Sequence, residues 1–184
     1  MKLTIIKTMR KLVLYIAMSL DGYIAAPGDD LGFLGKVEKE GEDYGYADFI
    51  EQVDTVIVGR RTYNWVIQHV PDFIHADKET YIITRTPQES IGNIHFYTGD
   101  IGELVTKLQA KEGKTIFCDG GAEVVHQLLQ RSLIDEFVIS VIPVFVGEGI
   151  RLFKDGRPGT DLKLISSKSF ETGLVQLHYE RSNK

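Results

Sequence analysis

Residues 117–123 read Phe-Cys-Asp-Gly-Gly-Ala-Glu, and here the sequence changes from a predicted strand to a predicted helix. The strand is the β-rich run 114–118. The helix is indicated by apolar residues at helical spacing, namely Val124, Val125, Leu128 and Leu129. The first N–H groups of a helix have no partner within the helix, and glycine lets the backbone come close to a ligand. A diphosphate would therefore fit this turn. A turn built from glycine only for tight packing explains the pair equally well.

Two further segments carry polar residues directly after a predicted strand. Strand 55–58 is followed by Gly59 and two arginines, and strand 80–84 is followed by Arg85. Ligands of open α/β sheets gather at the carboxyl ends of strands, and arginine offers charge-assisted donors to phosphate. Each segment alone is better explained as a connecting turn with solvated arginines. Three such segments at one sheet edge predict one extended anionic ligand, such as a dinucleotide.

The periodicity of the whole chain predicts strands that alternate with helices in a single domain, residues 1–184. Strands are expected at 12–17, 55–58, 80–84, 93–97, 114–118, 137–146, 163–170 and 174–181. Helices are expected around 46–53, 60–66, 101–108 and 124–129. Alternation favours a mostly parallel sheet, and a glycine-containing turn between the last two strands predicts a terminal antiparallel hairpin. The glycine spacing at 120–121 is not that of a Rossmann fold, which disfavours that fold.

Composition excludes several classes of protein. The chain has 184 residues, 43% of them hydrophobic and 26% charged, which is typical of a globular domain. A net charge of -5 lacks the basic footprint of a nucleic-acid-binding protein. No apolar run approaches the roughly 18 residues of a membrane span. The single cysteine, Cys118, rules out an intramolecular disulfide, and no zinc-ligand spacing occurs, so we expect a cytoplasmic protein without a metal site.

Residues 1–9 precede the first predicted strand. They contain one short apolar run, residues 3–6, whereas a secretory signal needs a longer apolar core. We therefore expect either a short extension or an alternative start at Met9.

The motifs, taken in order, resemble the dihydrofolate reductase superfamily. They are most similar to the reductase domain of the bifunctional riboflavin-biosynthesis deaminase–reductase, from about residue 12 to residue 181. The matching segments are 19–25 (Ser-Leu-Asp-Gly-Tyr-Ile-Ala), 58–63, 84–87, 119–122, 133–136 and 142–149 (Ile-Pro-Val-Phe-Val-Gly-Glu-Gly). The resemblance implies a three-layer α/β/α fold of the dihydrofolate reductase type. Its mixed, mostly parallel sheet would have about eight strands and end in an antiparallel hairpin, and its cofactor would be NADPH.

The resemblance also implies roles for individual residues. Ala17 and Ile24 would flank the nicotinamide, and the segment with Arg85 would receive the 2′-phosphate. The ribose and phosphates would be held by Gly59, Arg60, Arg61, Thr62, Thr84, Arg85, Gly120 and Gly121. Folate reductases carry a carboxylate on the helix after the first strand. Alignment through Phe49 puts Gly45 at that position, whereas counting back from Gly59 gives Asp43, which we take as the candidate proton-relay residue.

These observations favour an NADPH-dependent reductase of a small heterocyclic substrate, similar to the riboflavin-type enzyme. The alternatives are a dihydrofolate reductase and, from a different class, a nucleotide-binding module without catalysis. No deaminase domain accompanies the reductase-like region in these 184 residues, so we do not expect the bifunctional enzyme.

A homodimer is also expected. Segment 137–146 is rich in Val, Ile and Phe, and Pro143 within it lacks the N–H that a sheet ladder needs. A strand of this kind at a sheet edge invites pairing, which a two-fold partner would cover. The alternative is that residues 147–158 fold back over the same edge within one chain.

Overall fold

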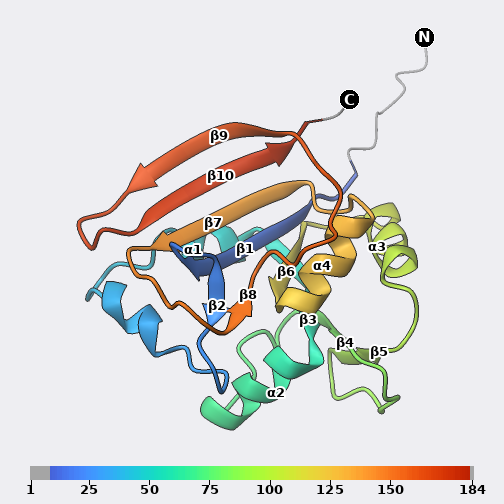
Figure 1. Ribbon diagram of the computed structural model, residues 1–184. Helices are drawn as coiled ribbons and strands as arrows, with labels where there is room; N and C mark the ends of the chain where they lie inside the picture. Colours follow the sequence, from blue (N-terminus) through green and yellow to red (C-terminus); the bar gives the residue numbers. More distant parts are fainter. Residues whose placement is uncertain (1–8, 183–184) are drawn as a thin grey trace.

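Eight strands form one mixed sheet in the order β5-β4-β3-β6-β1-β7-β10-β9 (Figure 1). The computed structural model describes residues 9–182, so the expected extension, apart from Met9, lies outside the described residues. The strands are β1 (Leu12–Ser19), β3 (Val53–Gly59), β4 (Glu79–Ile83), β5 (Ile94–Tyr97), β6 (Thr115–Gly120), β7 (Glu136–Ile142), β9 (Leu162–Ser169) and β10 (Val175–Arg181). All neighbouring pairs from β5 to β7 are parallel, and β10 pairs antiparallel with both β7 and β9.

Helices cover both faces of this sheet. The four helices are α1 (Tyr46–Glu51), α2 (Arg60–His69), α3 (Ile101–Ala110) and α4 (Ala122–Gln130). Successive strand residues point to opposite faces. Ile57 therefore packs in the cluster with α3 and α4, whereas Val56 packs with α1 and Val58 with α2. This is the predicted three-layer fold, with α3 and α4 in front of the sheet in Figure 1 and α1 behind it.

The predicted helical faces are largely confirmed. The apolar residues 101, 104, 105 and 108 of α3 are all buried, as are residues 124, 125 and 128 of α4. One boundary was wrong: Val53 was expected on the helix around 46–53, but α1 ends at Glu51 and Val53 begins β3. Val53 is buried in the sheet's core, and a residue that ends a helical stripe and begins a strand satisfies both periodicities.

A small second sheet lies beyond the carboxyl end of β1 and was not predicted. It pairs β2 (Tyr23–Ala25) with β8 (Ile150–Arg151), and the 3₁₀ helix η1 (Gly32–Val37) follows β2. Asp21 connects this region to the loop after β7. Its carboxylate accepts the N–H groups of Val146 and Gly147 at 3.0 and 2.7 Å and the hydroxyl of Ser19 at 2.5 Å.

These hydrogen bonds make a pH-dependent contribution to stability. Partial desolvation raises the pKa of Asp21, but donors from Ser19, Val146 and Gly147 outweigh it and lower the pKa from 3.8 to about 2. A lowered folded-state pKa stabilises the fold above the unfolded pKa, and the contribution is lost as the pH falls from about 4 to about 2. Asp21→Asn should therefore reduce the free energy of unfolding at pH 7, and the difference from the unchanged protein should shrink toward pH 2.

Urea unfolding at several pH values measures this difference. Asp155→Asn is the matched control, because Asp155 is exposed and its side chain makes no hydrogen bond to any residue of the described part of the chain. A constant difference between Asp21→Asn and the unchanged protein from pH 7 to pH 2 would show that the carboxylate's charge is unimportant.

The expected place of segment 137–146 in the sheet is wrong. β7 ends at Ile142 and lies between β1 and β10, so it is not an edge strand, and Pro143 follows the ladder instead of interrupting it. The terminal hairpin supplies β10, which covers β7, and leaves β9 as the edge strand at that end of the sheet, with all of its eight residues exposed. The alternative for residues 147–158 is also wrong, because β8 pairs with β2 and not with a sheet edge.

Candidate functional site

The three segments singled out in the sequence meet at one edge of the sheet. β4, β3 and β6 are parallel neighbours, with Gly59 opposite Ile83 on one side and Val58 opposite Gly120 on the other. Their carboxyl ends therefore lie side by side. Two of the three strands continue directly into helices, β3 into α2 and β6 into α4.

The starts of α2 and α4 approach each other closely at two glycines. A Cβ atom on Gly59 would lie 3.2 Å from Val124 Cγ2 and 3.5 Å from the backbone nitrogen of Gly121. A Cβ atom on Gly121 would lie 2.9 Å from Thr62 Oγ1, and Gly120 has a φ of +96°, which favours glycine. Gly59 and Gly121 are the residues that precede the two helices, and neither helix start has a side-chain cap. The first N–H groups of both helices thus lie, without side-chain caps, at a junction of two close helix starts, which we call the glycine cradle.

Arg60 and Arg61 border this edge but already have partners. Arg60 donates to Asn64 Oδ1 at 2.9 Å and to Gln88 Oε1 at 2.7 Å, and Arg61 forms a two-point ion pair with Asp29 at 2.7 and 3.0 Å. Together with neighbours on α2, they line a surface hollow of about 470 Å³. A phosphate that bound Arg61 would compete with Asp29. The Arg61 side chain is 70% exposed, so a phosphate could reach it and replace Asp29 as its partner.

Arg85 is the least constrained of the three arginines. It is exposed, follows the end of β4, and makes no side-chain hydrogen bond to any residue from 9 to 182. Its positive charge also reaches α4: the pKa of Glu123 is lowered mainly by a hydrogen bond from Lys154, and by Arg85 to a smaller extent. Before it, Thr84 Oγ1 accepts the N–H of Thr86 at 3.2 Å. The Arg85 guanidinium is therefore available to an anion.

Ala17 and Ile24 lie near the carboxyl end of β1. Ala17 packs against the cluster of Phe33 and Val37 on the α1 face, and Ile24, on β2, packs against the core of the α3–α4 face. Both residues are only partly buried, so apolar surface remains accessible at this end of the strand.

Asp43 has a structural role that the sequence did not indicate. Its carboxylate accepts the N–H groups of Ala47 and Gly45, each at 2.9 Å, and these two bonds lower its pKa. They stabilise the start of α1 and favour the ionised form, whereas a general acid needs to hold its proton near the working pH. The role of Asp43 as a proton relay stays a prediction.

Sequence reasoning missed a row of polar side chains on the α1 face of the sheet. Gln176 Nε2 donates to Tyr15 Oη at 3.0 Å and to Ser140 Oγ at 3.2 Å, and Tyr15 donates to the carbonyl of Tyr44 at 3.0 Å. Burial raises the pKa of Tyr15. The members of this row are Tyr15, Tyr44, Tyr46, His75, Asp119, Ser140 and Gln176. A signal was present for Asp119, which is a charged residue at the end of an otherwise apolar strand.

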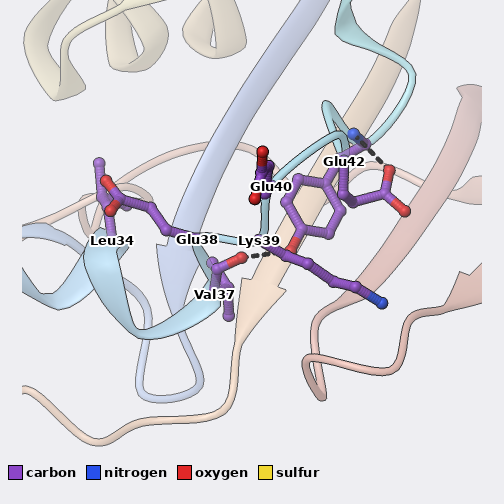
Figure 2. A pocket seen from close by; sticks show the side chains of 7 residues that line it. Leu34, Val37, Glu38, Lys39, Glu40 and Glu42 are labelled. Atoms are coloured by element: carbon purple, nitrogen blue, oxygen red, sulfur yellow. Dashed lines mark hydrogen bonds between the residues drawn. The ribbon is translucent and has the colours of Figure 1, made fainter.

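A second surface hollow, of about 430 Å³, lies between η1 and α1. Figure 2 shows its lining side chains, with Glu42 bonded to the N–H of Tyr44 and the Tyr44 hydroxyl bonded to the carbonyl of Val37. None of the expected cofactor residues lines it, and its three glutamates disfavour a phosphate. The glycine cradle, and not this hollow, is therefore the candidate nucleotide site.

Comparison with known proteins decides the family. The model of the RibD C-terminal domain matches residues 66–176. The chain belongs to this family. YwjB of Bacillus subtilis (strain 168), an uncharacterized protein, is 42% identical over 174 residues, which cover 94% of this chain and 99% of YwjB. A putative riboflavin biosynthesis protein from Shewanella sp. PV-4 superposes with a TM-score of 0.86 at 28% identity, covering 94% of this chain and 99% of that one.

The wider fold family is also clear. Dihydrofolate reductase from Enterococcus faecalis, solved with NADP(H), superposes with a TM-score of 0.64 at 14% identity, and the match covers 94% of this chain and 97% of that one. The RibD C-terminal domain thus has the fold of dihydrofolate reductase here, as its sequence resemblance implied.

Within residues 9–182 of this RibD-family chain, no helix is long and apolar enough to cross a bilayer. The same range holds no group of three or more histidine, cysteine, aspartate or glutamate side chains placed to bind a metal ion.

Proposed function

We propose that this protein is an NADPH-dependent reductase of a small heterocyclic substrate, related in activity to the reductase of riboflavin biosynthesis. The observation that carries the proposal is the glycine cradle between the starts of α2 and α4, where both helix starts lack side-chain caps and a Cβ atom at Gly59 or Gly121 would be crowded. Membership of the RibD C-terminal domain family and the similarity to a dihydrofolate reductase solved with NADP(H) support it. The single cysteine, Cys118, is free and buried, which is consistent with action in the cytoplasm.

The residues at the sheet edge fit a nicotinamide dinucleotide phosphate. The N–H groups around Gly59, Gly120 and Gly121 would take the diphosphate, and Arg85 would take the 2′-phosphate. Further polar contacts would come from Arg60, Arg61, Thr62 and Thr84, and Ala17 and Ile24 would flank the nicotinamide. The cofactor supplies the hydride, and the protein contributes binding, orientation and exclusion of water.

The cofactor assignment predicts a preference for NADPH over NADH. One charged hydrogen bond to the 2′-phosphate is worth about 1.5–3 kcal/mol, which corresponds to a preference of at least about tenfold. Arg85→Ala should remove most of this preference, because it should lower the affinity for NADPH about tenfold and leave the affinity for NADH nearly unchanged. Calorimetric titration with both nucleotides measures it.

Lys107→Ala is the matched control for Arg85→Ala. It removes one positive charge from α3, at an exposed position paired with Glu103. Equal losses of NADPH and NADH affinity in Arg85→Ala would place Arg85 away from the 2′-phosphate. Failure of NADPH to bind the unchanged protein would overturn the proposed function.

Two carboxylates are candidates to bind the polar edge of the substrate. Asp43 is proposed from its position before α1, and Asp119 from its place on the α1 face beside Gly120. Asp43→Asn and Asp119→Asn can be compared by NADPH oxidation with a panel of pterins and pyrimidines. The variant that loses turnover while keeping NADPH affinity identifies the carboxylate that acts on substrate.

The same panel separates the alternative functions. Turnover of dihydrofolate would support a dihydrofolate reductase. Tight binding of NADPH without oxidation by any heterocycle would support a nucleotide-binding module without catalysis.

We also propose that the protein is a homodimer that pairs through β9. This strand is one of the two edges of the sheet, the other being β5, and carries exposed apolar side chains, with Leu162 42%, Leu164 50% and Ile165 46% exposed. Edge strands of this kind pair readily, and a two-fold axis uses one such edge twice. Light scattering should give twice the chain mass of 20.7 kDa, and Leu164→Lys should shift it toward the monomer. A mass near 20.7 kDa for the unchanged protein would contradict the dimer.

A further inference from the structure

His75 is a buried polar side chain that the proposed cofactor site does not use. It lies between α2 and β4 and is 1% exposed. Its Nε2 atom is 3.3 Å from Asp119 Oδ2, and its Nδ1 atom is buried with no hydrogen-bond partner among residues 9–182. Buried polar groups are normally paired, so a histidine at this position calls for an explanation beyond packing.

Two aromatic rings hold the imidazole in place. The Phe73 and Phe117 rings both meet it edge-to-face, with centroid distances of 5.5 and 5.6 Å. Phe117 lies on β6 two residues before Asp119, so both residues point to the same face of the sheet. The two rings and Asp119 therefore constrain the orientation of the imidazole, and with it the direction of Nε2.

The contact with Asp119 determines which imidazole nitrogen carries the proton. Neutral histidine has one N–H group and one lone pair, and an ionised carboxylate only accepts. In the neutral tautomer that satisfies this contact, the N–H group is on Nε2 and donates to Asp119 Oδ2, and the lone pair is on Nδ1. An unpaired acceptor is tolerated in a protein interior more readily than an unpaired N–H group, so burial of Nδ1 favours the same tautomer.

Asp119 is accessible where His75 is not. Its side chain is 22% exposed, compared with 1% for His75. The β1–β6 ladder ends at the pair Leu14–Cys118, so Asp119 follows that pair on the carboxyl side, as Tyr15 does on β1. Burial raises the pKa of Tyr46, and the negative charge of Asp119 raises it further, which puts the phenol in the field of this carboxylate.

We infer that His75 is a positioning residue for Asp119. By donating Nε2–H to Oδ2, it fixes the carboxylate from the buried side and leaves Oδ1 to accept an N–H group of a planar heterocyclic substrate. The inference rests on the proposed function, because it places the substrate beside Ala17. It assigns to a buried histidine, remote in sequence from both Asp43 and the glycine turn, control over how substrate binds.

Substitution by leucine and glutamine separates positioning from packing. His75→Leu fills the same space with an apolar side chain of similar size but removes the hydrogen-bond donor. His75→Gln instead places an amide N–H near the position of Nε2. If His75 only packs, leucine is tolerated as well as or better than glutamine, because it removes a buried unpaired atom. If His75 positions Asp119, glutamine preserves ligand binding and leucine does not.

The probe is 2,4-diaminopyrimidine, a planar heterocycle with an N–H edge, titrated into the protein saturated with NADPH. The expected loss of affinity is about tenfold or more for Asp119→Asn and for His75→Leu, and less than about threefold for His75→Gln. Thermal melting should leave His75→Leu as stable as the unchanged protein. His178→Leu is the control, because it breaks a similar imidazole–carboxylate contact, 2.9 Å from His178 Nε2 to Glu136 Oε2, on β10 and β7.

The outcomes distinguish this inference from the proposed function. Equal probe affinity in His75→Leu and the unchanged protein overturns the positioning role, and so does a probe that fails to bind the unchanged protein. If His75→Leu does not fold, Asp119→Asn still tests the pair from the other side, and undiminished probe binding by that variant overturns it. Failure of NADPH itself to bind is a separate result of the first titration and overturns the cofactor assignment instead.

Discussion

NADPH affinity is expected to fall by about 100-fold, or about 2.7 kcal/mol, when Gly121 is replaced by valine. The first added carbon would lie 2.9 Å from Thr62 Oγ1, and the two methyl groups would add bulk beside the start of α4, which has no side-chain cap. Gly121 has a φ of -77°, a backbone conformation that any residue adopts, so valine adds no backbone strain of the kind reserved for glycine. The loss should therefore fall on ligand binding more than on folding.

Calorimetric titration with NADPH and a thermal melt of the same sample test this expectation. Gly35→Ala in η1 is the control, because a Cβ atom there meets no other atom within 4 Å. The turn would be mainly architectural if Gly121→Val melted far below the unchanged protein while its folded fraction still bound NADPH normally.

The junctions between strands and helices could be predicted because local sequence determines them. An apolar run followed by glycine and then by a helical stripe describes both 55–66 and 114–129, and each forms a strand that continues into a helix. Because consecutive parallel strands place their carboxyl ends on one side, the edge that brings Gly59, Arg85 and Gly120 together followed from the same pattern. The resemblance to the riboflavin-type reductase agrees with the family found.

The order of the last strands could not be predicted from local sequence. The apolar segment 137–146 has the composition of a strand either at the edge or inside the sheet, and only the return of β10 places it inside. The small β2–β8 sheet was missed for another reason. β8 has two residues, too few to show an alternating pattern, and Asp21 reaches its partners across 125 and 126 positions of sequence.

The polar row on the α1 face was missed because its contacts are long-range. His75 and Asp119 are 44 residues apart, and Gln176 meets Tyr15 across 161 residues. Each residue alone resembles an ordinary polar residue of a loop or strand. Only the register of β6, β1 and β7 brings them onto one face, and register is set by tertiary pairing and not by local propensity.

The largest effect on the free energy of unfolding is expected for Asp54→Ala, at the amino ends of the strands, away from the candidate nucleotide site. The Arg10 side chain is 4% exposed and pairs with Asp54 while donating to Thr55 Oγ1 at 2.8 Å and to the carbonyl of Lys114 at 2.7 Å. Asp54 Oδ2 in turn accepts the N–H of Lys114 at 2.7 Å. These contacts join the segment before β1 to the starts of β3 and β6. Removing Asp54 leaves a guanidinium buried without a counter-charge, which costs about 3–5 kcal/mol of the free energy of unfolding.

Arg10→Met tests whether the buried charge causes this loss. Methionine retains much of the apolar stem and removes the charge, and the Asp54 side chain left behind is 39% exposed, so water can solvate it. Its cost should be nearer the value of the lost hydrogen bonds, about 1–2 kcal/mol, and the double variant should lose less than the sum of the two single variants. Urea unfolding followed by circular dichroism measures all three. NADPH affinity should stay unchanged in each, because the pair lies at the amino ends of the strands. A greater loss for Arg10→Met than for Asp54→Ala would show that packing of the arginine stem, and not compensation of its charge, holds these strands together.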